Sequence, residues 1–189
     1  GHTRPGEILF GTDSHTCMAG AFNQFATGIG NTDAGFVLGT GKLLLKVPET
    51  MHFRLEGRLQ PGVMAKDVIL ECIGEIGFDG ATYRAMQFDG PGAAALNMDD
   101  RMTIANMAIE AGGKNGIFEF DAQTQAFVDY RTKLNGTRAT YEPVARDKDE
   151  RFCYERTVDL SKLEPTVACH PDPGQRKKAR ELGHIKLDR

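Results

Sequence analysis

No apolar stretch in this sequence approaches the length of a membrane span, and neither sign of charge dominates. A helix that crosses a bilayer needs about 20 predominantly apolar residues, and no uninterrupted run of that kind occurs among the 189 residues. The 23 basic and 26 acidic residues leave a formal net charge of −3, which provides no electrostatic footprint for nucleic acid or an anionic membrane. We therefore expect a protein that contacts neither.

The sequence also lacks a secretory signal and paired cysteines. No basic segment followed by an apolar segment opens the chain, although that combination is typical of signal peptides. The four cysteines, at positions 17, 72, 153 and 169, form no C-x-x-C pair, and their spacing matches no zinc site. We therefore expect reduced thiols and a cytoplasmic protein.

Neither end of the sequence has the features of a natural terminus. No initiator methionine stands at position 1, and residues 1–6 are typical of a loop that leads into a strand. Residues 184–189 alternate apolar and polar side chains, as a strand does, and the sequence stops there. Because 189 residues suit one ordinary domain, we expect residues 1–189 to be a single α/β domain of a longer chain.

A polar turn at residues 11–16 directly follows the apolar run at residues 8–10. Asp13, Ser14 and His15 supply a carboxylate, a hydroxyl and an imidazole in succession. Ligands bind beyond the carboxyl ends of strands in open α/β sheets, so this turn is a candidate site. The same residue types are also typical of a helix N-cap. The two interpretations are compatible, because a helix N-terminus favours anions.

Hydrophobic periodicity and turn residues predict alternating helices and strands. A segment rich in glycine and alanine predicts a helix that starts at Met18 and ends at the glycines at 28 and 30. Further helices are predicted over residues 34–41, 66–76, 124–130 and 175–182, and strands over 51–55, 85–90, 117–121, 154–160 and 163–168. This alternation favours an α/β fold with three layers, α/β/α, in which helices flank a mixed, mostly parallel sheet.

The stretch from Asn97 to Gly112 predicts a helix with favourable ends, because asparagine suits an N-cap and glycine suits the position after the last turn. Asn106 and Glu110 lie four residues apart and therefore on one face. Apolar residues nearly surround them, so we expect a buried helix, in which a carboxylate needs a cation or a donor. His15 is the most economical partner for Glu110; an exposed face is the alternative.

Together, these stretches resemble the aconitase superfamily, and the resemblance covers essentially the whole chain. Its most specific motifs are the polar turn and the helix that carries Asn106 and Glu110. Segments 1–6, 25–36 and 159–165 most resemble the large subunits of 3-isopropylmalate dehydratases (isopropylmalate isomerases). The homoaconitase and dimethylmalate dehydratase branches are the alternatives, as is a non-catalytic domain that binds an anion or a partner through the polar turn.

The resemblance implies a hydro-lyase that isomerises 2-isopropylmalate and 3-isopropylmalate by dehydration and rehydration, in leucine biosynthesis. It implies a [4Fe–4S] cluster with three cysteine ligands and one open iron that acts as a Lewis acid. Carried over to this sequence, it implies that Ser14 binds a substrate carboxylate, Asp13 orients a neighbouring histidine, and His15 holds the iron-bound water or hydroxyl. Glu110 would pair with His15, and Asn106 would line the cluster side.

The sequence departs from the family pattern at the cluster ligands. The family's cysteines belong to a later Ser-Cys-Thr type motif and a C-x-x-C, neither of which this sequence contains. His2 and His170 are interpreted as loop residues. We therefore expect no metal ligand within this chain and no [4Fe–4S] cluster bound by this segment alone. We expect activity only together with the rest of the large subunit, a small subunit and a small dicarboxylic hydroxy acid as substrate.

Overall fold

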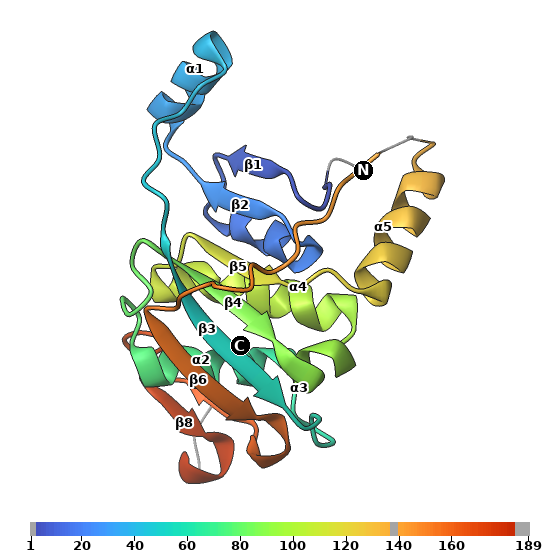
Figure 1. Ribbon diagram of the computed structural model, residues 1–189. Coiled ribbons are helices and arrows are strands. Elements are labelled where there is room, and N and C mark those ends of the chain that lie inside the picture. The colour runs from blue at the N-terminus through green and yellow to red at the C-terminus, as the bar shows by residue number, and fades with distance from the viewer. Residues whose placement is uncertain (1–2, 137–139, 184–189) are drawn as a thin grey trace.

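The structure is a computed structural model that describes residues 3–136 and 140–183 (Figure 1). The strands are β1 (Ile8–Gly11), β2 (Phe25–Gly28), β3 (Glu49–Glu56), β4 (Arg84–Asp89), β5 (Asn115–Phe118), β6 (Tyr154–Asp159), β7 (Thr166–Ala168) and β8 (Arg176–Lys178). The α-helices are α1 (Asn31–Thr40), α2 (Ala65–Ile76), α3 (Gly90–Ala95), α4 (Met98–Asn106) and α5 (Ala122–Leu134). The 3₁₀ segments are η1 (Ser14–Phe22), η2 (Met107–Ala111), η3 (Leu160–Lys162) and η4 (Ala179–Glu181). Within the described ranges, no helix is long and apolar enough to cross a bilayer.

The centre of the fold is a four-stranded sheet in the order β5-β4-β3-β6, in which every neighbouring pair is parallel. Three aromatic rings cross this sheet in one row, because Phe53, Phe88 and Phe118 occupy neighbouring strands. Their successive centroids are 5.5 and 5.3 Å apart, and all three side chains are buried. Such stacking adds to the burial of apolar area that stabilises a parallel sheet.

Helix α2 covers one face of the central sheet and lies behind it in Figure 1. It forms where the sequence predicts it, because Val68, Ile69, Cys72 and Ile73 follow a helical period and are all buried. The predicted end of the helix is also confirmed, since the backbone turns at Gly77 with a φ of +85°. The α/β fold with a mostly parallel sheet flanked by helices is therefore confirmed.

A second, smaller sheet pairs β1 with β2 in parallel, and η1 packs between this sheet and β5. The junction requires a glycine at position 20, where a Cβ atom would lie 2.0 Å from the carbonyl oxygen of Gly116. The buried side chain of Asn115 connects the two sheets: its oxygen accepts from Ala26 N at 3.4 Å, and its nitrogen donates to Gln24 O at 3.3 Å. These contacts hold the polar turn against the main sheet.

Two of the predicted helices are wrong. The helix predicted from Met18 ends at Asn23, whose left-handed conformation (φ 59°) closes η1 and turns the chain into β2. Pairing with β1 then decides the structure of residues 25–28, and α1 begins at Asn31. Residues 175–182 form β8 and η4 instead of a helix, because β7 offers β8 an antiparallel partner. Pairing with another strand overrides local helical propensity in both cases.

The helix predicted between Asn97 and Gly112 is present but changes type. Its start is confirmed by a capping box, in which Asn97 and Asp100 each accept from the other's backbone N–H. Its end is confirmed at Gly112, which adopts a φ of +78°. Helix α4 ends at Asn106, however, and continues as η2. The strand predicted over residues 184–189 and the loop position of His2 lie outside the described residues.

Candidate functional site

The polar turn follows β1 and begins η1, with Asp13 as the N-cap residue. The Asp13 carboxylate accepts from the backbone N–H of His15 at 2.8 Å, and its carbonyl oxygen accepts from Oγ1 of Thr16 at 2.7 Å. The capping interpretation is therefore confirmed. It is compatible with a site, because Asp13 and Ser14 remain exposed.

Glycines at the ends of two strands let the turn fold closely onto the small sheet. Gly11 and Gly28 are register partners in β1 and β2. A Cβ atom on Gly28 would lie 2.8 Å from the carbonyl oxygen of Asp13, and one on Gly11 would lie 2.5 Å from Oγ1 of Thr16. The turn therefore depends on both positions having no side chain.

His15 connects two elements that are far apart in the sequence. Its Nδ1 atom lies 2.9 Å from Oγ of Ser14, and its Nε2 atom lies 3.3 Å from Oε1 of Glu110 on η2. The structure thus brings together the two residues that the sequence pairs. The prediction of a buried carboxylate is wrong, because the side chains of His15 and Glu110 are each 39% exposed.

These contacts decide which ring nitrogen carries the proton when His15 is neutral. An ionised carboxylate only accepts hydrogen bonds, so Nε2 donates to Glu110. Nδ1 then accepts, and the Ser14 hydroxyl donates its single proton to it. When His15 is protonated, both ring nitrogens donate, and the Ser14 hydroxyl is free to donate elsewhere. The protonation state of His15 therefore controls what Ser14 can bind.

Asn106 lies at the junction of α4 and η2, where its carbonyl oxygen accepts from Sγ of Cys17 at 3.3 Å. Cys17 is buried, and this burial raises its pKa to about 11, so the thiol stays protonated and can donate. The hydrogen bond from Cys17 to Asn106 was not predicted from the sequence. The available signal was the position of Cys17, a small side chain that directly follows the polar turn.

The cysteines of this chain do not fit the iron–sulfur cluster that the family implies. Cluster ligands are thiolates, but burial raises the pKa of both Cys17 and Cys72. Cys153 is exposed, Cys169 is partly exposed, and all four are unpaired. Over residues 3–136 and 140–183, no group of three histidine, cysteine or acidic side chains could hold a metal ion.

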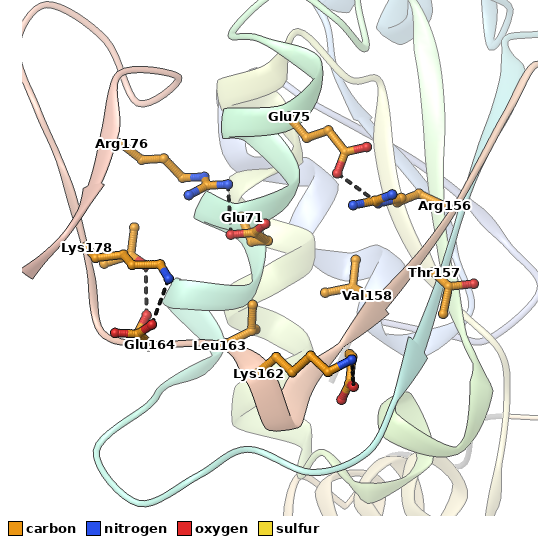
Figure 2. Close-up of a pocket in the computed structure, with 12 residues that line it drawn as sticks. Glu71, Glu75, Arg156, Thr157, Val158, Lys162, Leu163, Glu164, Arg176 and Lys178 are labelled. Atoms are coloured by element: carbon orange, nitrogen blue, oxygen red, sulfur yellow. Dashed lines mark hydrogen bonds and ion pairs between the residues drawn. The ribbon is translucent and has the colours of Figure 1, made fainter.

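A pocket of about 380 Å³ lies between α2, β6 and the β7–β8 hairpin (Figure 2). It is lined by charged residues that pair with one another. Figure 2 shows Arg176 and Lys178 reaching from the hairpin toward Glu71 and Glu164. The Arg176–Glu71 ion pair is 2.9 Å long, and the Lys178–Glu164 ion pair is 2.7 Å long. The Arg176–Glu71 ion pair connects the hairpin to α2. Because acidic and basic groups balance in the lining, the pocket has no excess of positive charge that would select an anion. The predicted site residues are not part of its lining.

A second histidine–carboxylate pair lies inside the molecule, and sequence reasoning missed it. Nε2 of His52 on β3 lies 2.8 Å from Oδ2 of Asp89 at the end of β4. Arg146 also pairs with Asp89, and the ring of Phe152 stacks on His52 at 4.4 Å between centroids. The segment that carries Arg146 and Phe152 crosses in front of the sheet in Figure 1. The available signal was the alternation of side chains along β3, because it places His52 on the face of the sheet opposite to that of Met51 and Phe53.

Comparison with known proteins places the chain in a family. The model of the aconitase family (aconitate hydratase) matches residues 1–186. The chain therefore belongs to the aconitase family.

Several curated proteins that are similar to this chain are large subunits of 3-isopropylmalate dehydratase. The chloroplastic 3-isopropylmalate dehydratase large subunit of Arabidopsis thaliana is 55% identical over 189 residues, which are 100% of this chain and 36% of the relative. The 3-isopropylmalate dehydratase large subunit of Moorella thermoacetica is 47% identical over 184 residues, which are 97% of this chain and 42% of the relative. The 3-isopropylmalate dehydratase large subunit of Syntrophus aciditrophicus is 47% identical over 184 residues, which are 97% of this chain and 43% of the relative. This chain thus spans well under half the length of these relatives.

Proposed function

We propose that this chain is the part of a 3-isopropylmalate dehydratase large subunit that supplies one wall of the active site. The enzyme would interconvert 2-isopropylmalate and 3-isopropylmalate by removing and returning water. The observation that supports this proposal most strongly is the Ser14–His15–Glu110 chain of contacts. It joins a strand-end turn to a helix 95 residues further along in a member of the aconitase family.

The three side chains have complementary tasks in this proposal. Glu110 holds the imidazole of His15 in one orientation by accepting a hydrogen bond from its Nε2. His15 holds a water molecule or hydroxide at the reacting carbons and moves its proton, as a histidine can near neutral pH. Ser14 donates to a substrate carboxylate when His15 is protonated. Asp13 fixes the backbone of His15 through the 2.8 Å contact, and Asn106 lines the side that faces the cluster.

The remaining components would come from outside this chain. A [4Fe–4S] cluster would be held by another part of the large subunit, because the cysteines described here do not fit it. The substrate would also contact a small subunit. This segment alone, folded as one unit over residues 1–189, would be inactive. We propose a cytoplasmic location in which thiols stay reduced; the name of the Arabidopsis relative places that protein in the chloroplast.

The test uses a full-length large subunit that contains this segment, prepared with its small subunit under anaerobic conditions. We expect bound iron and acid-labile sulfide, and conversion of 2-isopropylmalate to 3-isopropylmalate. Homoaconitate and dimethylmalate, supplied in parallel, distinguish the other branches of the superfamily. Preferred turnover of either one would overturn the choice of substrate. A protein with no iron and no turnover of any of the three acids would leave an anion-binding or partner-binding domain as the function.

A further inference from the structure

Helix α1 and the linker after it have little contact with the rest of the molecule. Figure 1 shows α1 standing away from both sheets, and no residue of the helix is buried. Leu38 is 89% exposed, and in the linker Leu44 is 99% and Val47 is 85% exposed. Phe36 is also exposed. Residues 31–47 thus present several large apolar side chains to solvent, which is typical of a surface that binds a partner.

The helix has too little intrinsic stability to persist alone. It is 10 residues long, whereas isolated helices shorter than about 12–15 residues are marginal in water even when rich in alanine. Gly35 and Gly39 lie within it, and glycine is among the least favourable residues in a helix interior. Its N-cap is Gly30, which makes no side-chain capping bond. An ordered α1 therefore needs contacts that the described residues do not supply.

The surface of this segment is suited to close packing against protein. Gly35, Gly39 and Gly41 have no atom within 4 Å of where a Cβ would lie, so a partner could approach the backbone. The segment is attached at its far end, where the backbone N–H of Lys46 donates to the hydroxyl of Tyr83 at 3.3 Å. The linker after the helix carries Lys42 and Lys46 and no acidic residue up to Pro48.

The position of α1 indicates what covers it. Gly11 and Gly28 are paired in register, so the polar turn after β1 and α1 after β2 leave the small sheet at the same edge. The relatives are more than twice as long as the matched part, since that part is 36–43% of their length. The additional polypeptide must reach the polar turn if it is to complete the proposed site. It would therefore also lie beside α1.

We propose that residues 31–47 dock onto the part of the large subunit that this chain does not match. Docking would order α1 and would hold the additional polypeptide at the edge where Ser14 and His15 are exposed. This inference rests on the proposed function only in that the segment works within a large subunit. Its test needs no turnover, so the two proposals can fail separately.

Hydrogen–deuterium exchange measures the docking directly. We expect the amides of residues 31–40 to exchange at nearly unprotected rates in the 189-residue chain. In the full-length large subunit without its small subunit, we expect at least tenfold slower exchange. Protection that appears only after the small subunit is added would overturn the proposal in favour of a subunit interface. Protection in the 189-residue chain that disappears on dilution would overturn it in favour of a second copy, and equal exchange in all samples would overturn docking itself.

A matched pair of variants tests which side chains form the contact. Leu38→Ser in the full-length subunit should restore rapid exchange at residues 31–40. Leu134→Ser makes the same change at an exposed leucine on α5 and should leave this exchange unchanged. If Leu38→Ser retains full protection, the exposed apolar side chain of Leu38 does not form the docking contact.

Discussion

Two histidine–carboxylate pairs, His15–Glu110 and His52–Asp89, look alike in composition and differ in surroundings. The first pair is 3.3 Å long with both side chains 39% exposed, whereas the second is 2.8 Å long with side chains 9% and 2% exposed. By distance and burial alone, His52–Asp89 would be chosen as the reactive pair. It is, however, closed off by Phe152 and by a salt bridge with Arg146.

The comparison shows that accessibility matters more than a short distance in locating a site. Asp89 accepts hydrogen bonds from both His52 and Arg146. Its carboxylate therefore connects β3, β4 and the segment that carries Arg146. His15 instead lies between a hydroxyl and a carboxylate at an exposed edge, where a substrate can reach it. We therefore propose a structural role for the buried pair and a chemical role for the exposed pair.

The largest expected effect is on turnover, from Glu110→Gln in the full-length enzyme. The amide keeps the shape of the side chain but loses the negative charge of the group that orients His15. We expect turnover to fall by about 10²–10⁴-fold, the usual contribution of acid–base catalysis. The free energy of unfolding should change by at most about 1 kcal/mol, because the pair is exposed. Steady-state kinetics and a denaturant titration separate these quantities, and unchanged turnover would remove Glu110 from the site.

The second prediction concerns the buried pair. Asp89→Asn leaves His52 and Arg146 without their shared anion, and we expect unfolding to require about 3 kcal/mol less free energy. Glu155→Gln is the matched control, since Glu155 approaches the same histidine at 3.7 Å but is 69% exposed; its effect should stay below about 1 kcal/mol. Urea denaturation of both variants measures the difference. Equal effects would contradict the distinction between buried and exposed partners.

A smaller effect is expected from Ser14→Ala, which tests whether Ser14 binds the substrate. Loss of one hydrogen bond to a substrate carboxylate should raise KM about tenfold. The value of kcat should change less than KM, because the lost contact is to a carboxylate and not to the reacting carbons. Steady-state kinetics of the two proteins measure both constants, and an unchanged KM would remove Ser14 from the substrate-binding residues.

The last prediction extends the comparison to the pH dependence of a carboxylate that is paired with an arginine. Burial tends to raise the pKa of Asp121, but hydrogen bonds from Arg101 and Thr124 outweigh it and hold the pKa below its usual value. A lowered pKa in the folded state stabilises the protein above about pH 4, the unfolded value, and this contribution disappears as the pH falls further. Asp121→Asn should therefore be less stable than the wild type at pH 7 and should approach it at low pH. Thermal denaturation at several pH values measures the difference; a gap that persists in acid would contradict this assignment.

Elements with a complete local pattern could be predicted from the sequence. Helix α2 and the ends of the segment from Asn97 to Gly112 formed where expected, because burial period, capping residues and terminal glycines agree there. Residues 25–28 and 176–178 could not be predicted, because each becomes a strand only by pairing with another strand, and the local side-chain pattern does not show that pairing. The same limit applied to the candidate site: the sequence predicted the contact between His15 and Glu110, but it did not predict that both side chains are 39% exposed.

By itself, the sequence determined the family, the strand-end turn of Asp13, Ser14 and His15, and the choice of Glu110 as the partner of His15. These features depend on residue types at short spacings, which a chain carries whatever surrounds it. Tertiary structure alone decided that the side chains of His15 and Glu110 are exposed, that Asp89 pairs with His52 in the interior, and that no residue of α1 is buried. Exposure and pairing depend on which distant surfaces meet, and no local pattern of side chains encodes that meeting.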